Sequence, residues 1–323
     1  MKSMSRTSWI TLAGMAALLI LPPLFLWSGN EFYLQLATRL VILAIAAVSL
    51  NLVLGYGGLV SFGHAAYIGI GAYAVGIPAY HETYGGFDSI ASYDGLFHVA
   101  LAVGISALFA LVTGAISLRT KGVYFIMITM AFGQMAYYLF FSINEYGGDD
   151  GLVIDVRSEV PGLNLDNPLQ LYLLSYVALV AAMLIVRTII NSRFGMVIKG
   201  AKGNNDRLVG LGYNTYLYRL AAYVISGAMA GFAGALLGNF TTFISPEMMG
   251  WTRSGELMFM VILGGAATTF GPVLGAVIFI LLEEILSSYT IFWQLPFGLI
   301  LIGVVLFARG GLMGFLTTKW RKP

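Results

Sequence analysis

Residue types that do chemistry are scarce in this 323-residue chain and lie far apart. The chain has no cysteine, which excludes disulfides, thiolate catalysis and Cys-ligated metal. Its three histidines are separated and lack the carboxylate-rich pattern of a metal site, and we expect His81 and His98 to be simply solvated at the two ends of a loop. No G-x-x-x-x-G-K-[ST] loop is present, so ATP hydrolysis by that route is excluded. We therefore predict no catalytic residue, no metal, no cofactor and no enzyme activity.

The composition indicates which elements must position the few polar groups. Hydrophobic residues make up 59% of the chain and charged residues 10%, against about 25% charged residues in soluble domains. Polar side chains are therefore too few to cover a surface in water. The balance of 17 Lys+Arg and 15 Asp+Glu argues against binding to nucleic acid. We predict an all-α, polytopic integral membrane protein with one transmembrane domain over residues 1–323.

Long, continuous apolar runs favour helices over the short alternating strands of a β-barrel. We predict about ten transmembrane helices, at 10–27, 32–54, 58–80, 96–118, 122–142, 169–190, 217–239, 255–266, 271–286 and 292–308. Glycines and a proline interrupt 255–286, which is either two short helices meeting in a tight turn or one span with a re-entrant piece. The first 30 residues resemble a signal peptide, but the long apolar part and the lack of an A-x-A site favour an uncleaved helix.

The distribution of basic residues predicts the orientation, because cytoplasmic segments are enriched in Lys and Arg. With ten spans and an inner N-terminus, 14 of the 17 basic residues fall on the cytoplasmic side, where Asp206 is the sole acidic residue. Most other acidic residues fall outside, many of them in the predicted periplasmic loop at 143–168. Both termini are therefore predicted to be cytoplasmic.

Glycines and polar residues interrupt the apolar sequence between the second and third predicted spans. Gly57, Gly58 and Gly63 permit unwound backbone, and Ser61 and His64 place polar groups beside it. Non-helical backbone at membrane depth is tolerated only inside protein or beside a wet cavity. The segment is therefore either a break that lines a pathway or a tight cytoplasmic turn with a capping serine.

The segment from Arg193 to Arg219 is the longest cytoplasmic stretch in this prediction. A helix-like apolar pattern lies within basic surroundings at Met196, Val197, Leu208, Val209 and Leu211. Such a segment either lies on anionic lipid or docks a cytoplasmic partner, and composition alone favours the lipid surface.

Two further glycine-rich segments are prominent. Gly227, Gly231, Gly234 and Gly238 are spaced by 4, 3 and 4 residues, which places them on one helical face and predicts close helix packing, in this chain or with another subunit. The second segment, Leu263 to Gly275, has a Thr-Phe-Gly that parallels Ser-Phe-Gly at 61–63, so a parallel internal repeat is one interpretation.

Ionisable residues inside the predicted spans are few. Arg39, Glu283 and Glu284 lie near outer helix ends, and no acidic residue lies at a span centre. Proton- or ion-coupled transporters usually need such a residue, because a buried carboxylate is costly and is kept for use. The remaining hydroxyls, amides and imidazole suit a neutral or zwitterionic solute better than a cation.

Five stretches carry a resemblance to a known family. GGLVSFGHAAYIGIGAY, LRTKGVYFIMITMAFGQ, YGGDDGL, LAAYVISGAMAGFAGALLG and LGGAATTFGPVLGA follow in order between about residues 40 and 315. They closely resemble the larger permease of the branched-chain amino-acid ABC importers, and urea and amide importers have similar permeases. The resemblance implies an all-helical membrane subunit that pairs with a related second permease, two ATP-binding subunits and a periplasmic solute-binding protein.

The resemblance also implies that the segment 193–213 couples to the ATP-binding subunit. It departs from the family's usual arginine and acidic run at 199–206 and keeps the Leu-Gly ending. The resemblance favours docking over the lipid surface, and the candidate coupling residues are Arg193, Lys199, Lys202, Asp206, Arg207, Leu211 and Gly212.

We therefore predict a permease in the bacterial inner membrane that forms half of a pathway for branched-chain amino acids and is driven from outside itself. Ser61, His64 and Tyr124 are the candidate pathway residues. The candidate hinge or packing glycines are Gly57, Gly58, Gly63, Gly227, Gly231, Gly234, Gly238, Gly264, Gly265 and Gly271. The alternatives are a permease for urea or short amides and a stand-alone secondary transporter or channel.

Overall fold

The computed structural model describes residues 6–27, 31–307 and 310–318, and most of them are helical. The α-helices are α1 (Arg6–Trp27), α2 (Glu31–Asn51), α3 (His64–Tyr84), α4 (Gly95–Ser117), α5 (Val123–Ser142), α6 (Pro168–Asn191), α7 (Arg193–Gly203), α8 (Asn205–Gly210), α9 (Thr215–Thr241), α10 (Trp251–Gly264), α11 (Gly271–Tyr289), α12 (Gln294–Phe307) and α13 (Gly311–Thr318). A π-helix, η1 (Leu52–Tyr56), extends α2, and η2 (Asn144–Tyr146) and η3 (Pro246–Met249) are 3₁₀ turns. One antiparallel pair of short strands joins β1 (Leu152–Val153) to β2 (Phe243–Ile244).

Each of the ten predicted helical ranges contains a helix, which supports the polytopic, helical architecture. Among the described residues, six helices are long and apolar enough to cross a membrane, namely α2 with η1, α4, α5, α6, α9 and α11. Helix α10 has 14 residues, so it is about 21 Å long and shorter than a hydrocarbon core of about 30 Å. The number of spans stays a prediction, and the terminal residues 1–5 and 319–323 lie outside the described part.

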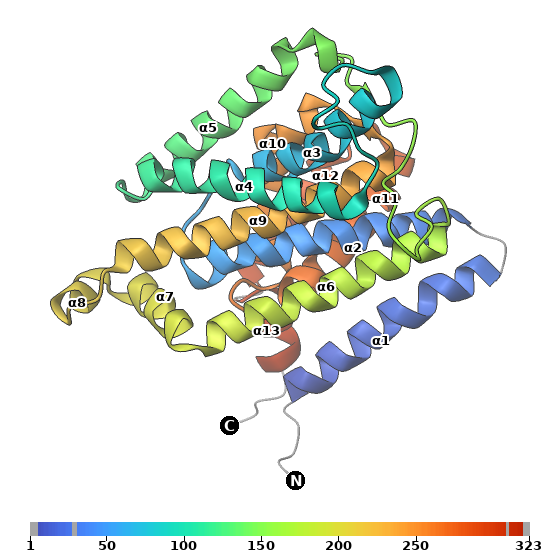
Figure 1. Ribbon diagram of the computed structural model, residues 1–323. Helices are drawn as coiled ribbons and strands as arrows, with labels where there is room; N and C mark the ends of the chain where they lie inside the picture. The colour runs from blue at the N-terminus through green and yellow to red at the C-terminus, as the bar shows by residue number, and fades with distance from the viewer. Residues whose placement is uncertain (1–5, 28–30, 308–309, 319–323) are drawn as a thin grey trace.

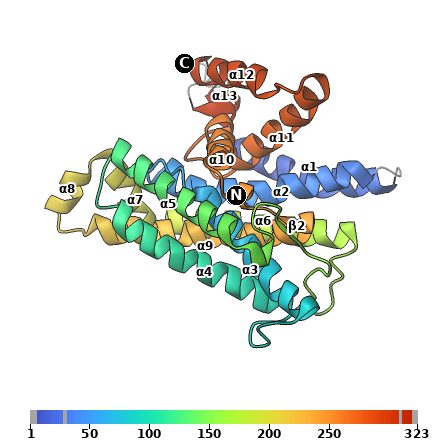
Figure 2. The same cartoon turned by 90° about the horizontal axis from the view of Figure 1, so that it is seen from above.

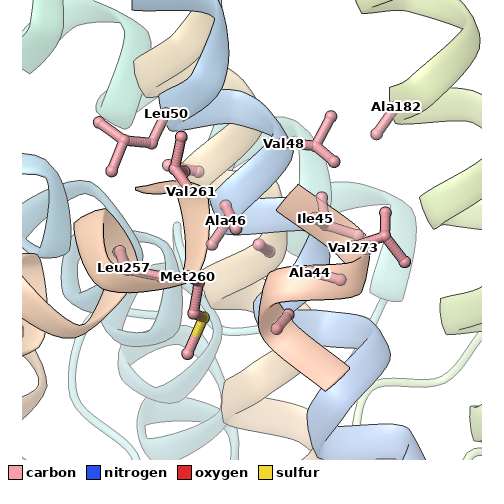
Figure 3. Packing of buried hydrophobic residues seen from close by; sticks show 14 of the residues in the cluster. Ala44, Ile45, Ala46, Val48, Leu50, Ala182, Leu257, Met260, Val261 and Val273 are labelled. Carbon is pink, nitrogen blue, oxygen red and sulfur yellow. The ribbon is translucent and has the colours of Figure 1, made fainter. Parts of the chain in front are cut away.

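Helix α2 is the centre of the bundle. Its residues from Leu40 to Asn51 are buried almost without interruption, because α2 contacts α1, α6, α9, α10 and α11. In Figure 2, helices α10 to α13 gather on one side of α2, and α3, α4, α5 and α9 lie on the other; Figure 1 shows the same bundle from the side. Figure 3 shows Ala44, Ile45 and Val48 of α2 facing α10, α11 and α6. An apolar sequence on all sides suits a helix that is surrounded by protein.

The glycine stripe on α9 packs against α3 and α4 of the same chain. A Cβ on Gly227 or Gly231 would overlap side chains of α4, at Ala110 and Ser106. A Cβ on Gly234 would overlap the main-chain carbonyl of Ile68 on α3, and one on Gly238 would come into van der Waals contact with Ala72 of α3. Small residues let helix backbones approach closely where the hydrophobic effect does not drive association. The packing partner is therefore within this chain.

Helices α10 and α11 form a closely packed hairpin. A Cβ on Gly264 would overlap the carbonyl oxygen of Gly271, and a Cβ on Gly275 would overlap that of Met260. The connecting turn is tight, with φ of +119° at Gly265 and +61° at Ala267. Of the two interpretations of residues 255–286, two helices that meet in a tight turn agrees with this structure.

The outer loops fold over the helix ends and bury two histidines, so the expectation that His81 and His98 are solvated was wrong. Their exposed fractions are 2% and 1%. The imidazole of His98 hydrogen-bonds to Ser158 Oγ at 2.7 Å and to the carbonyl of Ser92 at 2.8 Å, and His81 Nε2 lies 3.0 Å from the hydroxyl of Tyr146. Ser158 and Tyr146 lie 60 and 65 residues away from the histidines they contact, so the local pattern did not reveal them.

The α9 stripe gives a test of the packing. Gly234→Ala is expected to lower stability by about 1–3 kcal/mol, because the added methyl group meets a backbone carbonyl that cannot rotate away. Thermal unfolding of the detergent-purified chain measures this. The matched control is Gly104→Ala on α4, where a Cβ meets open space and a helical alanine is expected to be neutral or slightly stabilising. Equal stability of the two variants would contradict the packing.

Candidate coupling site

The chain leaves the α-helical path at the C-terminal end of α2, where the first glycine segment was predicted to break it. The last turn widens into the π-helix η1, and residues 57–63 are not helical before α3 begins at His64. Gly58 has φ of +69°, which a side chain would disfavour. A π-helical turn in an α-helix frequently marks a functional site. The break between the second and third predicted helices is therefore real, and it involves Gly57, Gly58 and Gly63.

The predicted coupling segment folds as two short helices at one end of the bundle (Figure 1). Ser192 caps α7 by accepting a hydrogen bond from the amide of Gly195, and Asn204 caps α8 through the amide of Arg207. Short polar side chains are favoured at this position because they satisfy free amides of the first turn. The segment that contains Lys199, Lys202, Asp206 and Arg207 is thus a helix–turn–helix.

Side chains of helix α7 contact η1, the π-helical end of α2. The ammonium of Lys202 donates a hydrogen bond of 2.7 Å to the carbonyl oxygen of Gly55 in η1. The ammonium of Lys199 lies 5.8 Å from the centre of the Tyr56 ring. On the other side of α7, the guanidinium of Arg219 on α9 donates to the carbonyl of Ala201 at 2.8 Å. The contacts tie α7 to both α2 and α9.

A second side chain joins the two glycine breaks. The Asn51 side chain accepts a hydrogen bond from the Ala267 amide and donates one to the Thr268 carbonyl, both at 2.9 Å. It therefore satisfies two backbone groups of the α10–α11 turn from the last residue of α2. The two Phe-Gly motifs that suggested a repeat lie at the starts of α3 and α11.

A cavity of about 310 Å³ lies between the first glycine break, the turn before α5, helices α7 and α8, and the start of α9. Basic groups on its wall come from three segments of the chain, with one acidic residue among them. The lining includes Gly57, Gly58, Lys121, Gly122, Lys202, Asn205, Asp206 and Arg219. A movement of α7 or α8 would therefore change the shape of a cavity that the first break also lines.

Several apolar side chains on the coupling segment face outward. Met196, Val209 and Leu211 are 62%, 54% and 66% exposed, whereas Val197 is buried against the bundle. A separate hollow of about 600 Å³ is lined by Arg193, Met196, Val197, Leu208, Tyr213 and Tyr218. The apolar pattern in the sequence therefore divides into a face that packs inward and a face that is left open, with Gly212 at the end of α8 in a left-handed turn.

Ser61 and His64 lie in a buried polar network rather than at a surface. Both side chains are fully buried. The hydroxyl of Ser61 lies 3.3 Å from that of Tyr223, and Nε2 of His64 lies 3.2 Å and 3.3 Å from the hydroxyls of Ser49 and Ser226. Ser61 does not cap α3, since Gly63 is the capping position and no side chain bonds there.

The hydroxyl groups of Ser49 and Ser226 donate their protons to backbone carbonyl groups. Ser49 donates to Ala46 and Ser226 donates to the carbonyl of Ser49. Both hydroxyl oxygens therefore accept from His64, which places the imidazole proton on Nε2. Nδ1 then has a buried lone pair with no partner among the described residues.

Tyr124 is not part of the network. Its side chain is 73% exposed on the first turn of α5, whereas the Tyr67 ring packs edge-on against both His64 and Tyr223. The structure thus brings two of the three candidate pathway residues into one network and leaves the third on the surface.

Sequence reasoning did not select Asn51, Tyr223 or Ser226, although each holds part of this site. The sequence did contain a signal for Asn51. Its side-chain amide lies beside a glycine break inside an apolar run, where it needs hydrogen-bond partners within the protein. For Tyr223 and Ser226 no local signal existed, because their partners are more than 150 residues away in the chain.

Comparison with known proteins gives consistent matches. Residues 32–309 match the protein family described as "Branched-chain amino acid transport system / permease component". The chain is 24% identical over 322 residues to the high-affinity branched-chain amino acid transport system permease protein LivM of Salmonella typhimurium, covering 92% of this chain and 73% of the relative. LivM of Escherichia coli K12 is also 24% identical, over 93% of this chain and 74% of the relative.

A shorter match involves a different permease. The permease protein LivH of Escherichia coli K12, from a transport system of the same description, is 27% identical over 146 residues, or 45% of this chain and 46% of the relative. No solved structure gives a significant match to the chain.

The contact between the two breaks can be tested by hydrogen exchange. Asn51→Ala removes the acceptor of the Ala267 amide, and losing a buried hydrogen bond costs about 1–3 kcal/mol. We expect amide exchange at 267–268 to be about tenfold or more faster, measured by mass spectrometry. Gln35→Ala, on an exposed position of the same helix, is the control. Unchanged exchange in Asn51→Ala would show that this side chain does not hold the turn.

Proposed function

Because the chain belongs to the permease component family of branched-chain amino acid transport systems, we propose that it is the larger permease of an ATP-driven importer of hydrophobic amino acids. It forms half of the translocation pathway in a bacterial inner membrane, together with a second, related permease. Two ATP-binding subunits act on the cytoplasmic face, and a periplasmic solute-binding protein delivers the solute outside. The partial similarity to both LivM and LivH supports the pairing of related permeases.

One observation carries the proposal: Lys202 of α7 is bonded to the carbonyl of Gly55, at the point where α2 is broken. Helix α2 is the centre of the bundle, and its last residue also holds the α10–α11 turn. A push on α7 would therefore act on both breaks at once. This arrangement suits a protein whose motion is imposed from the cytoplasmic side.

The exposed apolar face of the coupling segment is the proposed contact with an ATP-binding subunit. Met196, Val209 and Leu211 lie outward among basic residues at the end of the bundle, and soluble surfaces keep such apolar groups where a partner covers them. Arg193 lines the adjoining hollow. Docking is favoured over a lipid surface because the segment 193–213 corresponds to the family's coupling segment, and the inner face of α7 is buried against the protein.

We assign Ser61 and His64 to the α2–α3–α9 interface that opens when the bundle tilts. In this conformation Nε2 of His64 bonds to the hydroxyls of Ser49 and Ser226 and the helices pack around them, so the pathway is closed at this level. Tyr124 joins the pathway from an exposed surface that meets the second permease. Selectivity then rests mainly on the binding protein, with the permease supplying small and hydroxyl-bearing surfaces.

The function is tested by reconstitution. We expect the chain to co-purify with ATP-binding subunits from its own host, and proteoliposomes of the whole complex to take up L-leucine only with ATP and the binding protein. Uptake of L-leucine by the chain alone would support the stand-alone transporter instead. ATP-dependent uptake of urea or acetamide without uptake of leucine would support the amide permease.

The connection through Lys202 is tested in the same complex. Lys202→Met is expected to lower leucine uptake per ATP hydrolysed at least fivefold, because α7 loses its bond to the broken end of α2. Lys199→Met removes the same charge from the same helix, where the ammonium contacts an aromatic ring instead, and should have a smaller effect. Equal uptake-to-ATP ratios in the two variants and the parent would exclude this route of coupling.

A further inference from the structure

A cluster of charged side chains lies beside a cavity between α2, α3, α9 and α10. The cavity has a volume of about 150 Å³. In the predicted orientation it lies in the outer half of the bundle, because Arg39 is the ninth residue of α2 and Arg253 is in the first turn of α10. The wall consists of Arg39, Leu43, Ile68, Leu237, Thr241, Met248, Arg253, Glu256, Leu257 and Met260.

The cluster contains two ion pairs whose four charges sum to zero, and the exposed Glu247 of η3 also interacts electrostatically with Arg253. One nitrogen of the Arg39 guanidinium donates to both carboxylate oxygens of Glu283, at 2.9 and 3.1 Å. One nitrogen of Arg253 donates to Glu256 at 2.9 Å. Glu256 also interacts electrostatically with Arg39 and Glu283. Since a guanidinium has five N–H donors, both arginines keep donors for a further anion at the cavity.

Packing explains only one of the two pairs. The Arg39–Glu283 pair joins α2 to α11, which are far apart in sequence, so it has a structural role. Arg253 and Glu256 are three residues apart on one helix, so their pair joins no two elements. The side chains of Arg253 and Glu256 nevertheless both line the cavity. Ionisable groups are kept at membrane depth at a cost and generally mark a substrate or ion pathway.

We propose that this cavity is a transient binding site for a zwitterionic amino acid with an apolar side chain, an assignment that rests on the proposed function. The ligand's carboxylate accepts hydrogen bonds from the guanidinium groups of Arg39 and Arg253, and its ammonium group donates to Glu256. Because the two ion pairs are together neutral, a zwitterion can interact with both signs of charge and leaves neither pair unbalanced. A carboxylic acid or an amine alone would leave one charge of the cluster without its partner, which costs free energy.

The apolar part of the wall fits the rest of such a ligand. Side chains of Leu, Ile and Met from five elements line the cavity opposite the charges. A cavity of about 150 Å³ with an apolar wall is large enough to take up benzene, and a branched aliphatic side chain is of similar size. Urea and short amides have neither the two charges nor the apolar group, so this site discriminates against them.

Binding of L-leucine to the purified complex tests the site without requiring turnover. Glu256→Gln and Arg253→Met are expected to weaken leucine binding more than tenfold, measured with radiolabelled ligand in the absence of ATP and of the binding protein. These changes remove a pair within one helix, so α2 and α11 stay joined. The double variant Arg253→Glu/Glu256→Arg, which keeps both charges on the wall, should recover part of the binding. Arg157→Met, which removes an outer ion pair with Asp166, is the matched control.

Two ligand analogues test the recognition of both charges. An excess of 4-methylpentanoate, which lacks the ammonium group, and of 3-methylbutylamine, which lacks the carboxylate, should each displace leucine at least tenfold less well than leucine itself. Displacement by 4-methylpentanoate as strong as by leucine would overturn the zwitterion site, as would normal binding in Glu256→Gln and Arg253→Met. These results differ from failure of the proposed function, in which the parent complex takes up no leucine with ATP and the binding protein.

Discussion

The constraint on which the rest of the structure depends is that backbone groups freed by a broken helix must find partners inside the protein, because lipid supplies none. The helical path of this chain is interrupted at residues 57–63, before α3, and at residues 265–270, between α10 and α11. Lys202 bonds to the carbonyl of Gly55 at the first interruption, and Asn51 bonds to both sides of the second turn. The side chains that satisfy the backbone are therefore the same ones that connect separate parts of the bundle.

Because the same side chains satisfy the backbone and connect the helices, a movement of one helix affects the others. A lysine from the coupling segment is the partner of the first break, so the free energy of the broken helix depends on where α7 lies. If α7 moves, the carbonyl of Gly55 loses its donor unless η1 moves with it. The Asn51 side chain then carries the same displacement to the α10–α11 hairpin, whose glycines pack backbone against backbone and leave little room for independent motion.

The middle of the bundle combines tight packing with a small set of polar side chains. Glycines of α9 bring it into backbone contact with α3, and the buried hydroxyl and imidazole groups of Ser49, His64 and Ser226 lie in the neighbouring layer. Two ion pairs, Arg39–Glu283 and Arg253–Glu256, lie beside a cavity between α2, α3, α9 and α10. A neutral interior of this kind suits a protein that passes a solute and does not itself store the driving energy.

The sequence by itself determined the membrane class, the ten helical ranges, the two glycine breaks and the amphipathic coupling segment, since these depend on local composition and spacing. Only the tertiary structure decided that Asn51 joins the two breaks, that His81 and His98 are buried, that Tyr124 lies apart from Ser61 and His64, and that Arg253 and Glu256 lie beside the Arg39–Glu283 pair. The reason is physical. Helix formation and insertion depend on neighbours within a few turns, whereas each of these contacts joins residues tens to hundreds of positions apart, and no periodic pattern in one segment specifies which face of another it will meet.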